Sequence, residues 1–314
     1  MGVPPGANRV GTARAERKGE GRRVGLRGER ETLRADLHSH STASDGTCPP
    51  AEVMRRARAA GLDVIALTDH DTVAGHEEAR RALPRGLTLL PGMELSCRLE
   101  GHSVHLLAYL FDPEHEELAT ELARIRGSRE QRARAMVARL AELGAPVTWE
   151  QVSALAGNGV VGRPHIARAM VAAGVIASPE QAFGPDWIGA GGRAYVTRYA
   201  LDPARAVALI RDAGGVTVLA HPRVAERGWT VPDDRIADLA AAGLSGIEVR
   251  HPDQDPAQRA ELQALAGRLG LVASGGSDDH GELTGYRIGS DTIAPDAYER
   301  LVSQATGGTP VSGR

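Results

Sequence analysis

Two histidines alternate around a single serine in the segment Asp36-Leu37-His38-Ser39-His40. Side chains two residues apart in a β-strand point to the same face, so His38 and His40 could bind one metal ion together. Such a pair arises often by chance, but six more candidate sites follow it, mostly at the ends of apolar, strand-like runs. These sites are Asp45, Thr68-Asp69-His70, Gly92-Met93-Glu94, His105, Ala220-His221-Pro222 and Ser277-Asp278-Asp279-His280. The repetition indicates a hydrolase that uses several metal ions.

Nine side chains are the candidate metal ligands of this sequence. They are His38, His40, Asp45, His70, Glu94, His105, His221, Asp278 and His280. One ion that keeps a water takes only about three to five protein ligands, so this set predicts two or three ions bridged by a carboxylate. Mixed imidazole and carboxylate donors suit Mn, Fe or Zn better than Mg or Ca.

Other polar residues near these motifs are given weaker roles. Four histidines are interpreted as ordinary core or surface residues: His76, His102, His115 and His251. Three acidic residues stand beside candidate ligands: Asp69, Asp71 and Asp279. They could accept hydrogen bonds that orient the imidazoles, or they could be solvated acids.

Composition excludes several other chemistries. Lys18 is the only lysine, which excludes Schiff-base catalysis and a P-loop lysine. No Gly-x-Ser-x-Gly segment is present, which argues against a serine-hydrolase nucleophile. Cys48 and Cys97 show neither a zinc-type spacing nor a disulfide pattern, so a reducing cytoplasm is expected. Cys97 is interpreted as a small buried residue, although it could be an oxidisable neighbour of the site. No long apolar run is found, so neither a membrane span nor a secretory signal is expected.

The charge is unevenly placed along the chain. The net charge is −3, but residues 1–34 are rich in glycine and arginine and carry a positive excess. This composition predicts a disordered tail, more simply a dispensable extension than an RNA or membrane contact. The remaining body is acidic, which fits carboxylates that bind cations and does not favour nucleic-acid binding over the whole surface. No stable protein partner is inferred.

From residue 35 onward, short apolar runs alternate with amphipathic stretches. Strands are expected over 36–40, 64–67, 87–90, 104–110, 216–219, 246–249 and 271–274. Helices are expected from Pro50 to about Gly61 and over 76–83, 203–213, 234–242 and 256–269. The alternation predicts a parallel sheet with crossover helices, and polar residues at successive strand ends are typical of a β/α barrel.

Between residues 113 and 200 this alternation stops. A long charged helix is expected over 116–143, shorter helices over 148–155 and 164–173, and a strand over 194–197. We interpret 113–200 as a helical insertion that could cover the substrate. The barrel would then comprise 35–112 and 201–290, followed by a C-terminal helix and tail over 291–314.

The chain resembles the PHP (polymerase and histidinol phosphatase) family of metal-dependent phosphoesterases over roughly residues 35–290. The shared motifs are His-x-His, Thr-Asp-His-Asp, Gly-x-Glu, His-x-Leu-x-Tyr, Ala-His-Pro and Gly-Ser-Asp-x-His. The resemblance is greatest to the branch of nucleoside 3′,5′-bisphosphate phosphatases and 5′–3′ exoribonucleases. That branch also has an inserted helical domain with Gly-Arg-Pro-His, which is found here at 162–165.

The resemblance implies an α/β fold, a distorted barrel of seven strands, and three metal ions, with Mn as the expected metal. The first ion would be held by His38, His40, Glu94 and Asp278, the second by Glu94, His105 and His221, and the third by Asp45, His70 and His280. Glu94 would bridge two ions, and Glu94, Asp278 and His280 are expected to act most directly in catalysis. A metal-activated hydroxide would attack phosphorus in line, between ions about 3.5–4 Å apart.

Arginine should bind substrate phosphates away from the metals, because its planar fork matches phosphate oxygens. Arg163 is the first candidate, since it begins a helix whose N-terminus also favours anions, and His165 follows it. Arg193 and Arg198 lie where the insertion rejoins the barrel.

Several aromatic and basic residues of the insertion have less certain roles. Tyr195 and Tyr199 could stack a base beside Arg193 and Arg198. The pair Arg129 and Arg132 is interpreted as a solvated helix face, although it could face the pocket. The remaining aromatic pair, Phe183 and Trp187, is expected to pack in the insertion's own core.

We therefore expect a phosphoesterase that acts on a nucleotide. The favoured reaction removes the 3′-phosphate of a nucleoside 3′,5′-bisphosphate or trims the 5′ end of a short RNA. Few aromatic residues favour a small substrate over a long stacked strand. The alternatives are a histidinol-phosphate-type phosphatase and a non-catalytic metal-binding module, since a fold and its metals do not name a substrate.

Overall fold

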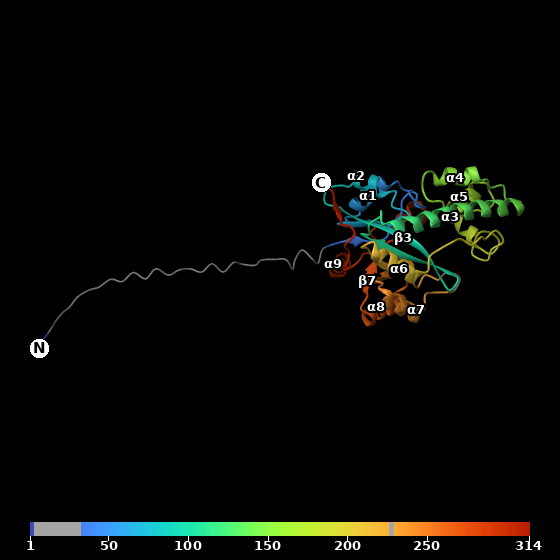
Figure 1. The fold of residues 1–314 in the computed structure, drawn as a ribbon. Coiled ribbons are helices and arrows are strands. Elements are labelled where there is room, and N and C mark those ends of the chain that lie inside the picture. Colours follow the sequence, from blue (N-terminus) through green and yellow to red (C-terminus); the bar gives the residue numbers. More distant parts are fainter. Residues whose placement is uncertain (3–32, 226–228) are drawn as a thin grey trace.

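The computed structural model describes residues 1–2, 33–225 and 229–314 (Figure 1). The tail expected over residues 1–34 lies almost wholly outside the described residues. No helix in the described part of the chain combines the length and the apolar character needed to cross a membrane.

One mixed sheet forms the centre of the molecule, with strand order β1-β2-β3-β4-β5-β6-β7 and β8 paired to β3. The strands are β1 (Ala35–Asp36), β2 (Val64–Leu67), β3 (Thr88–Leu99), β4 (His102–Tyr109), β5 (Val216–Leu219), β6 (Gly246–Arg250), β7 (Val272–Gly275) and β8 (Val311–Ser312). The amide of Leu37 donates to the Gly275 carbonyl at 3.3 Å, and Ser39 pairs with Asp279, so the two edges of the sheet meet. The sheet therefore closes almost completely and confirms the distorted barrel.

The expectation of an all-parallel sheet is wrong at β4. This strand runs antiparallel to both β3 and β5, whereas the other barrel neighbours are parallel. The reason is the connection, because only Glu100 and Gly101 join β3 to β4, and both have positive φ (50° and 89°). Two such residues make a tight hairpin turn, which leaves no room for a crossover helix.

The first strand is also shorter than the expected 36–40. Beyond Asp36, the amide of His38 bonds to the side-chain carboxylate of Asp36 (3.2 Å) and not to a neighbouring strand. Ser39 instead anchors this segment to β2, because its hydroxyl donates to the Ala66 carbonyl at 2.6 Å. The segment that carries both histidines is therefore held by side-chain hydrogen bonds in addition to single backbone bonds, such as that of the His40 amide to the Asp279 carbonyl at 2.9 Å.

The barrel helices follow their sequence signals closely. They are α1 (Pro50–Ala59), α2 (His76–Arg81), α6 (Pro203–Asp212), α7 (Asp233–Ala242), α8 (Pro256–Leu269) and α9 (Pro295–Val302). Proline stands in the first turn of four of them, where its missing N–H is not needed. Asp202 and Asp255 cap α6 and α8 through hydrogen bonds to backbone amides in the first turn.

A group of helices lies beside the barrel: α3 (Glu116–Glu142), α4 (Trp149–Ala156), α5 (Arg163–Ala172) and a 3₁₀ turn, η1 (Pro179–Phe183). In Figure 1, α4 and α5 lie along the long helix α3, at the opposite end of the molecule from α9. These helices share an apolar core that includes Met136, Leu140, Ile166, Met170 and Ile188. A separate core fills the barrel interior, between residues such as Leu37, Leu90, Leu107, Tyr109 and Val218.

One expectation about an irregular segment is wrong. The strand expected over 194–197 is absent, because carbonyl groups there bond to α3: Arg132 Nε donates to the Val196 carbonyl (2.9 Å), and Arg139 donates to that of Tyr195. Of the C-terminal residues, α9 lies in the region where a helix was expected, and the end of the chain after it forms β8, which pairs with β3, while Val311 packs against an apolar cluster.

Candidate metal centre

The nine predicted ligands converge at one end of the barrel. His38 and His40 follow β1, His70 follows β2, His221 follows β5, and Asp278 and His280 follow β7, while Asp45 lies on the loop before α1. Glu94 and His105 instead lie inside β3 and β4, because this hairpin continues past the barrel. A parallel bridge between His70 and Glu94 holds the loop after β2 against β3.

Glu94 stands at the middle of this group. Its side chain is 2% exposed, and Oε1 lies 2.7 Å from His105 Nδ1 and 3.2 Å from His221 Nε2. The other oxygen, Oε2, lies 3.0 Å from His70 Nδ1, 3.1 Å from His40 Nε2 and 3.4 Å from His38 Nε2. One carboxylate therefore faces two different sets of imidazoles with its two oxygens, which is the arrangement of a bridging ligand.

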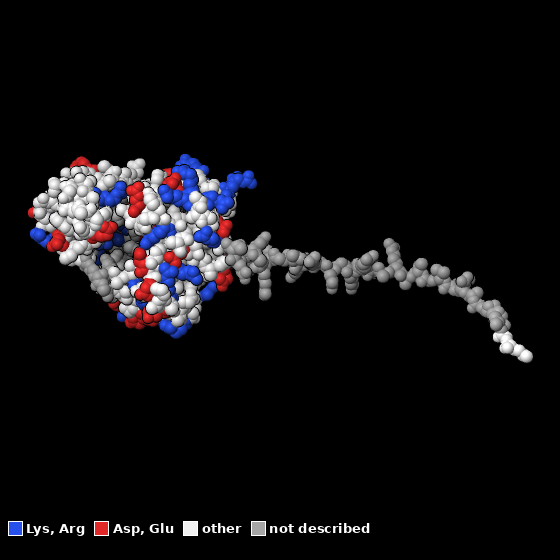
Figure 2. Space-filling model, turned by 180° about the vertical axis from the view of Figure 1, so that it is seen from behind, with Lys and Arg blue, Asp and Glu red and all other residues white. Residues whose placement is uncertain are grey.

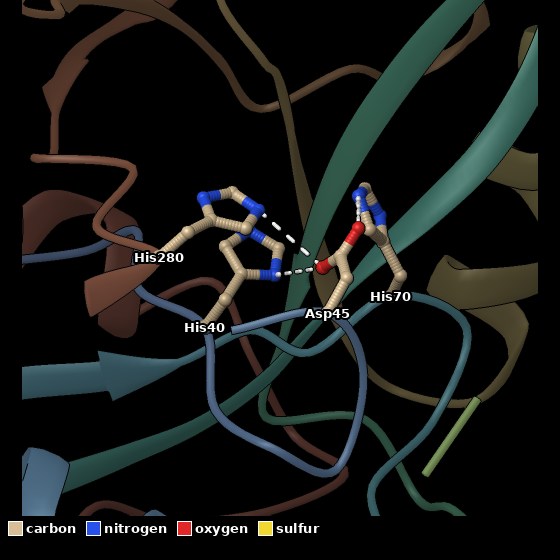
Figure 3. Close-up of side chains that lie close together, drawn as sticks. All are labelled: His40, Asp45, His70 and His280. Carbon is tan, nitrogen blue, oxygen red and sulfur yellow. Dashed lines mark ion pairs between the residues drawn. The ribbon is translucent and has the colours of Figure 1, made fainter. Parts of the chain in front are cut away.

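Potential ligand atoms that lie within 4.8 Å of one another form three overlapping groups. The groups are His40, Asp45, His70 and His280; His38, His40, Glu94 and Asp278; and His70, Glu94 and His105. Figure 3 shows the first group, in which the carboxylate of Asp45 lies between His40 and His280 on one side and His70 on the other. His221 lies outside these groups but contacts Glu94.

The donor set fits divalent cations. Asp45 Oδ1 and His70 Nδ1 are buried and make no hydrogen bond, although such atoms almost always have a partner. Burial opposes a charge on His40, yet Asp278 and Glu94 outweigh it and raise the pKa of His40 to about 10. Burial lowers the pKa of His70 to about 3. Without metal, the crowded carboxylates thus keep some imidazoles protonated, and bound divalent cations would replace those protons.

Two residues of this centre were misjudged or missed. His251 was expected to be an ordinary histidine, but it is buried with Nε2 3.3 Å from Asp278 Oδ2. Glu248 was not singled out, although it is fully buried beside His38 Nδ1 at 3.2 Å. A sequence signal existed for Glu248, since it is a carboxylate between Ile247 and Val249 in an apolar strand.

Neither expected role holds for the acids next to the ligands. Asp69 accepts from the Ser41 amide (2.8 Å), Asp71 from Arg129 Nε (2.5 Å), and Asp279 from the Arg287 amide (2.6 Å). All three are buried, so they are not solvated, and none of these bonds goes to an imidazole. They fix the loops that carry the ligands.

The metal centre lines a cavity of about 960 Å³, together with the helical insertion. Its wall includes Arg98 and Arg287 of the barrel, Arg129, Arg132, Arg163 and Arg198 of the insertion, and the rings of Phe183 and Tyr195. On the face of the molecule drawn in Figure 2, arginines are interspersed with Asp and Glu. Inside the cavity, by contrast, most of the arginines come from the insertion, whereas the carboxylates among the predicted ligands come from the barrel.

The insertion arginines are crowded against one another. Burial, reinforced by Arg163 and Arg198, lowers the pKa of Arg132 to about 9, and burial with Arg129 lowers that of Arg198 to about 10. The solvated face expected for Arg129 and Arg132 is wrong, because Arg129 is buried against Asp71 and both line the cavity. Crowded buried cations favour an anionic ligand.

The other predicted contacts divide into two groups. Arg163 and Arg198 line the cavity, whereas Arg193 is exposed and His165 is buried with Nδ1 accepting from the Gly162 amide at 3.0 Å, and neither lines it. Phe183 does not belong to the insertion core, because it is 39% exposed. The centroid of its ring lies 5.4 Å from Arg163 Cζ.

Three further side chains named in the sequence analysis lie in different places relative to the cavity. Trp187 packs against the helical core, as expected. Tyr199 lies away from the cavity, since its hydroxyl donates to Glu121 at 2.7 Å and Arg124 covers its ring. Cys97 is buried, as expected, and lines the cavity, where burial raises its pKa.

Comparison with known proteins agrees with this geometry. A profile of the PHP domain matches residues 36–145. A 5′-3′ exoribonuclease of Haemophilus influenzae is 37% identical over 79% of this chain and 90% of its own length. A 3′,5′-nucleoside bisphosphate phosphatase of Chromobacterium violaceum is 36% identical over 80% of this chain and 89% of its own. Among solved structures, a protein from Bifidobacterium adolescentis assigned as a metal-dependent phosphoesterase superposes with a TM-score of 0.82, at 35% identity, over 88% of this chain and 97% of its own.

Proposed function

Because this chain belongs to the PHP family of metal-dependent phosphoesterases, we propose that it hydrolyses the 3′-phosphate ester of a nucleotide that also carries a 5′-phosphate. Nucleoside 3′,5′-bisphosphates and the 5′ ends of short RNAs both meet this description. The observation that carries the proposal is a cavity in which a cluster of metal-ligand side chains and a separate cluster of arginines face the same space.

We propose a trinuclear centre with the ligand division given by the family. Side-chain distances support this division with three exceptions: His40 also lies with Asp45 and His280, His70 also lies with Glu94 and His105, and His221 lies outside the groups although it contacts Glu94. Two imidazoles could therefore serve either of two neighbouring ions. The mixed donors favour Mn, with Zn or Fe as the other candidates.

The chemistry divides between the two clusters. Bound divalent ions would lower the pKa of the attacking water and neutralise charge on the phosphoryl oxygens. Glu94, Asp278 and His280 would hold the ions at the end of the cavity where the phosphate ester is cleaved. The arginines bind the remote 5′-phosphate, and that fixed contact orients the 3′-phosphate toward the ligand cluster. Phe183 and Tyr195 offer apolar rings for the base.

One bond cleavage accounts for both substrates. Water attacks the phosphorus, and the bond from phosphorus to the 3′ oxygen breaks. A bisphosphate then gives a nucleoside 5′-phosphate and inorganic phosphate. An RNA gives the same nucleoside 5′-phosphate and a chain one nucleotide shorter with a new 5′-phosphate. We propose that the 113–200 insertion acts as the substrate-binding lid for both substrates.

The alternative substrate, histidinol phosphate, carries one phosphate. It would leave the insertion arginines without a ligand, so their burial favours the two-phosphate substrate.

Phosphate release from four substrates tests the proposal. Metal-stripped protein reconstituted with Mn should release phosphate from adenosine 3′,5′-bisphosphate faster than from 3′-AMP, 5′-AMP or histidinol phosphate. His38→Ala should abolish the release. Equal rates on 3′-AMP and the bisphosphate would refute the role of the arginines, and a preference for histidinol phosphate would replace the substrate.

A further inference from the structure

We propose that Glu248 is a positioning residue that fixes His38 and the His221 loop for metal binding. The inference rests on the proposed metal centre. It concerns a residue outside the nine ligands, on β6, the one strand of the barrel path that supplies no proposed ligand.

The geometry around Glu248 uses both of its oxygens. Oε1 lies 3.2 Å from His38 Nδ1, and Oε2 accepts a hydrogen bond from the His221 amide at 2.8 Å. The side chain is fully buried, and no arginine or lysine pairs with it among the described residues. Burial of a carboxylate is unfavourable unless both of its oxygens have polar partners, and these two contacts supply them.

The first contact selects the tautomer of His38. A neutral imidazole has one N–H donor and one acceptor nitrogen. A carboxylate beside Nδ1 keeps the proton on that atom, which leaves the lone pair on Nε2. That nitrogen faces the centre, 3.2 Å from Asp278 Oδ1 and 3.4 Å from Glu94 Oε2. Carboxylates placed behind metal-binding imidazoles both orient the ring and raise its basicity.

The second contact holds a strained backbone. His221 has a φ of 29°, which a side-chain-bearing residue rarely adopts. Its amide is fixed by Glu248 Oε2, so the same carboxylate that orients His38 also holds the loop after β5. Strand β6 is the neighbour of β5, whereas the segment after β1 that carries His38 lies on the far side of β7, so the Glu248 side chain joins two segments at the end of the closed barrel.

The residue that follows β6 acts in the same way on a different ligand. His251 Nδ1 accepts from the Asp253 amide at 3.1 Å, so its Nε2 carries the proton and donates to Asp278 Oδ2 at 3.3 Å. Asp278 Oδ1 is then left to face His38 and His40 at 3.2 and 3.3 Å. Glu248 and His251, at the end of β6, thus both contact and orient side chains that are proposed metal ligands.

Glu248→Gln tests the proposal with metal affinity as the readout. His38 and the His221 amide face different oxygens of Glu248, and in a carboxamide one of these oxygens becomes an NH2 donor, so one of the two contacts is lost. Mn affinity, measured by competition with a chromophoric chelator, should fall about 10- to 100-fold. The metal-free variant should keep the wild-type circular dichroism spectrum. Glu121→Gln changes a carboxylate on α3 that contacts Tyr199 and Arg124 and no proposed metal ligand, so it should leave Mn affinity unchanged. Wild-type Mn affinity in Glu248→Gln would overturn the proposal.

A second measurement needs no variant of Glu248. In Zn-loaded wild-type protein labelled with ¹⁵N-histidine, His38 should show a protonated Nδ1 and a metal-shifted Nε2, with His38→Ala to assign the signals. Coordination through Nδ1 would overturn the proposal. Failure of the proposed function is distinguishable, because a protein that binds Mn but releases no phosphate would refute the substrate and leave the role of Glu248 intact.

Discussion

At the scale of single residues, the centre depends on carboxylates surrounded by imidazoles. Burial opposes ionisation of Glu94, but His70, His105 and His38 around it hold its pKa well below the usual range. The sequence motifs predicted all nine converging side chains, because most motifs place a ligand type just after a strand, while Glu94 and His105 lie within the β3–β4 hairpin. Glu248 and His251 could not be predicted in the same way, since their contacts depend on which strands flank β6 in the closed barrel.

The first prediction concerns the pH dependence of metal binding. The pKa of His40 is raised to about 10 in the metal-free protein, so its imidazole carries a proton throughout the neutral range. An ion needs the neutral ring, and binding must release that proton. Mn affinity should therefore keep rising with pH above pH 7, by up to about tenfold per unit for one proton. Calorimetry in two buffers of different ionisation enthalpy measures the protons released. An affinity that levels off above pH 7 would contradict the assignment.

The second prediction concerns the remote phosphate. Arg163→Gln should lower kcat/KM for adenosine 3′,5′-bisphosphate by about 10- to 100-fold, the usual effect of losing one charge-assisted hydrogen bond. The rate with 3′-AMP should change little, because that substrate has no 5′-phosphate. Arg168→Gln is the matched control, since Arg168 lies on the same helix, α5, but does not line the cavity. An equal loss on both substrates would mean that Arg163 acts on the fold and not on the 5′-phosphate.

At the scale of elements, helix α3 connects the insertion to the metal centre. Arg129 on α3 is 2.5 Å from Asp71 on the loop after β2, and Arg129 Nη2 donates to Ser96 on β3 at 2.7 Å. The helix bounds were predictable from caps and apolar spacing. The inward direction of Arg129 was not, because a charged helix of this kind most often exposes its arginines to solvent. The antiparallel β4 was missed because a two-residue turn gives little signal beside the βα alternation.

The third prediction concerns this buried pair. Asp71→Asn should lower the free energy of unfolding by about 3 kcal/mol, because it leaves the Arg129 charge uncompensated. Asp71 has φ 56°, which asparagine tolerates, so the change isolates the charge. The pKa of Asp71 is lowered to about 2, below its ordinary value of 3.8: burial opposes the ionised form but Arg129 outweighs it. The stabilisation is therefore fully present at neutral pH and is lost only as the pH falls from about 4 through 2.

Urea unfolding at pH 5, 6.5 and 8 should give the same difference between Asp71→Asn and wild type. Asp212→Asn, on the exposed side of α6, should change stability by less than about 0.5 kcal/mol. A difference that grows across this pH range would contradict the assigned ion pair.

At the scale of the whole molecule, the cavity joins two parts with separate apolar cores. The barrel supplies the ligand cluster and the helical group supplies most of the arginines. The sequence predicted the barrel and the break in its pattern. It could not show that the two parts enclose one cavity, because that depends on how α3 packs against the loops after β2 and β3. Because the ligand cluster and the arginines are separate within this cavity, they favour a substrate with two phosphates.

One titration tests whether bound metal ions are needed for hydrolysis of the bisphosphate. Mn is added back to metal-stripped protein, while bound metal per chain and phosphate release from adenosine 3′,5′-bisphosphate are measured on the same samples. No phosphate release is expected without metal, and full activity is expected when three ions are bound per chain. Release from the metal-stripped protein, or full loading with no release from the bisphosphate, would contradict this expectation.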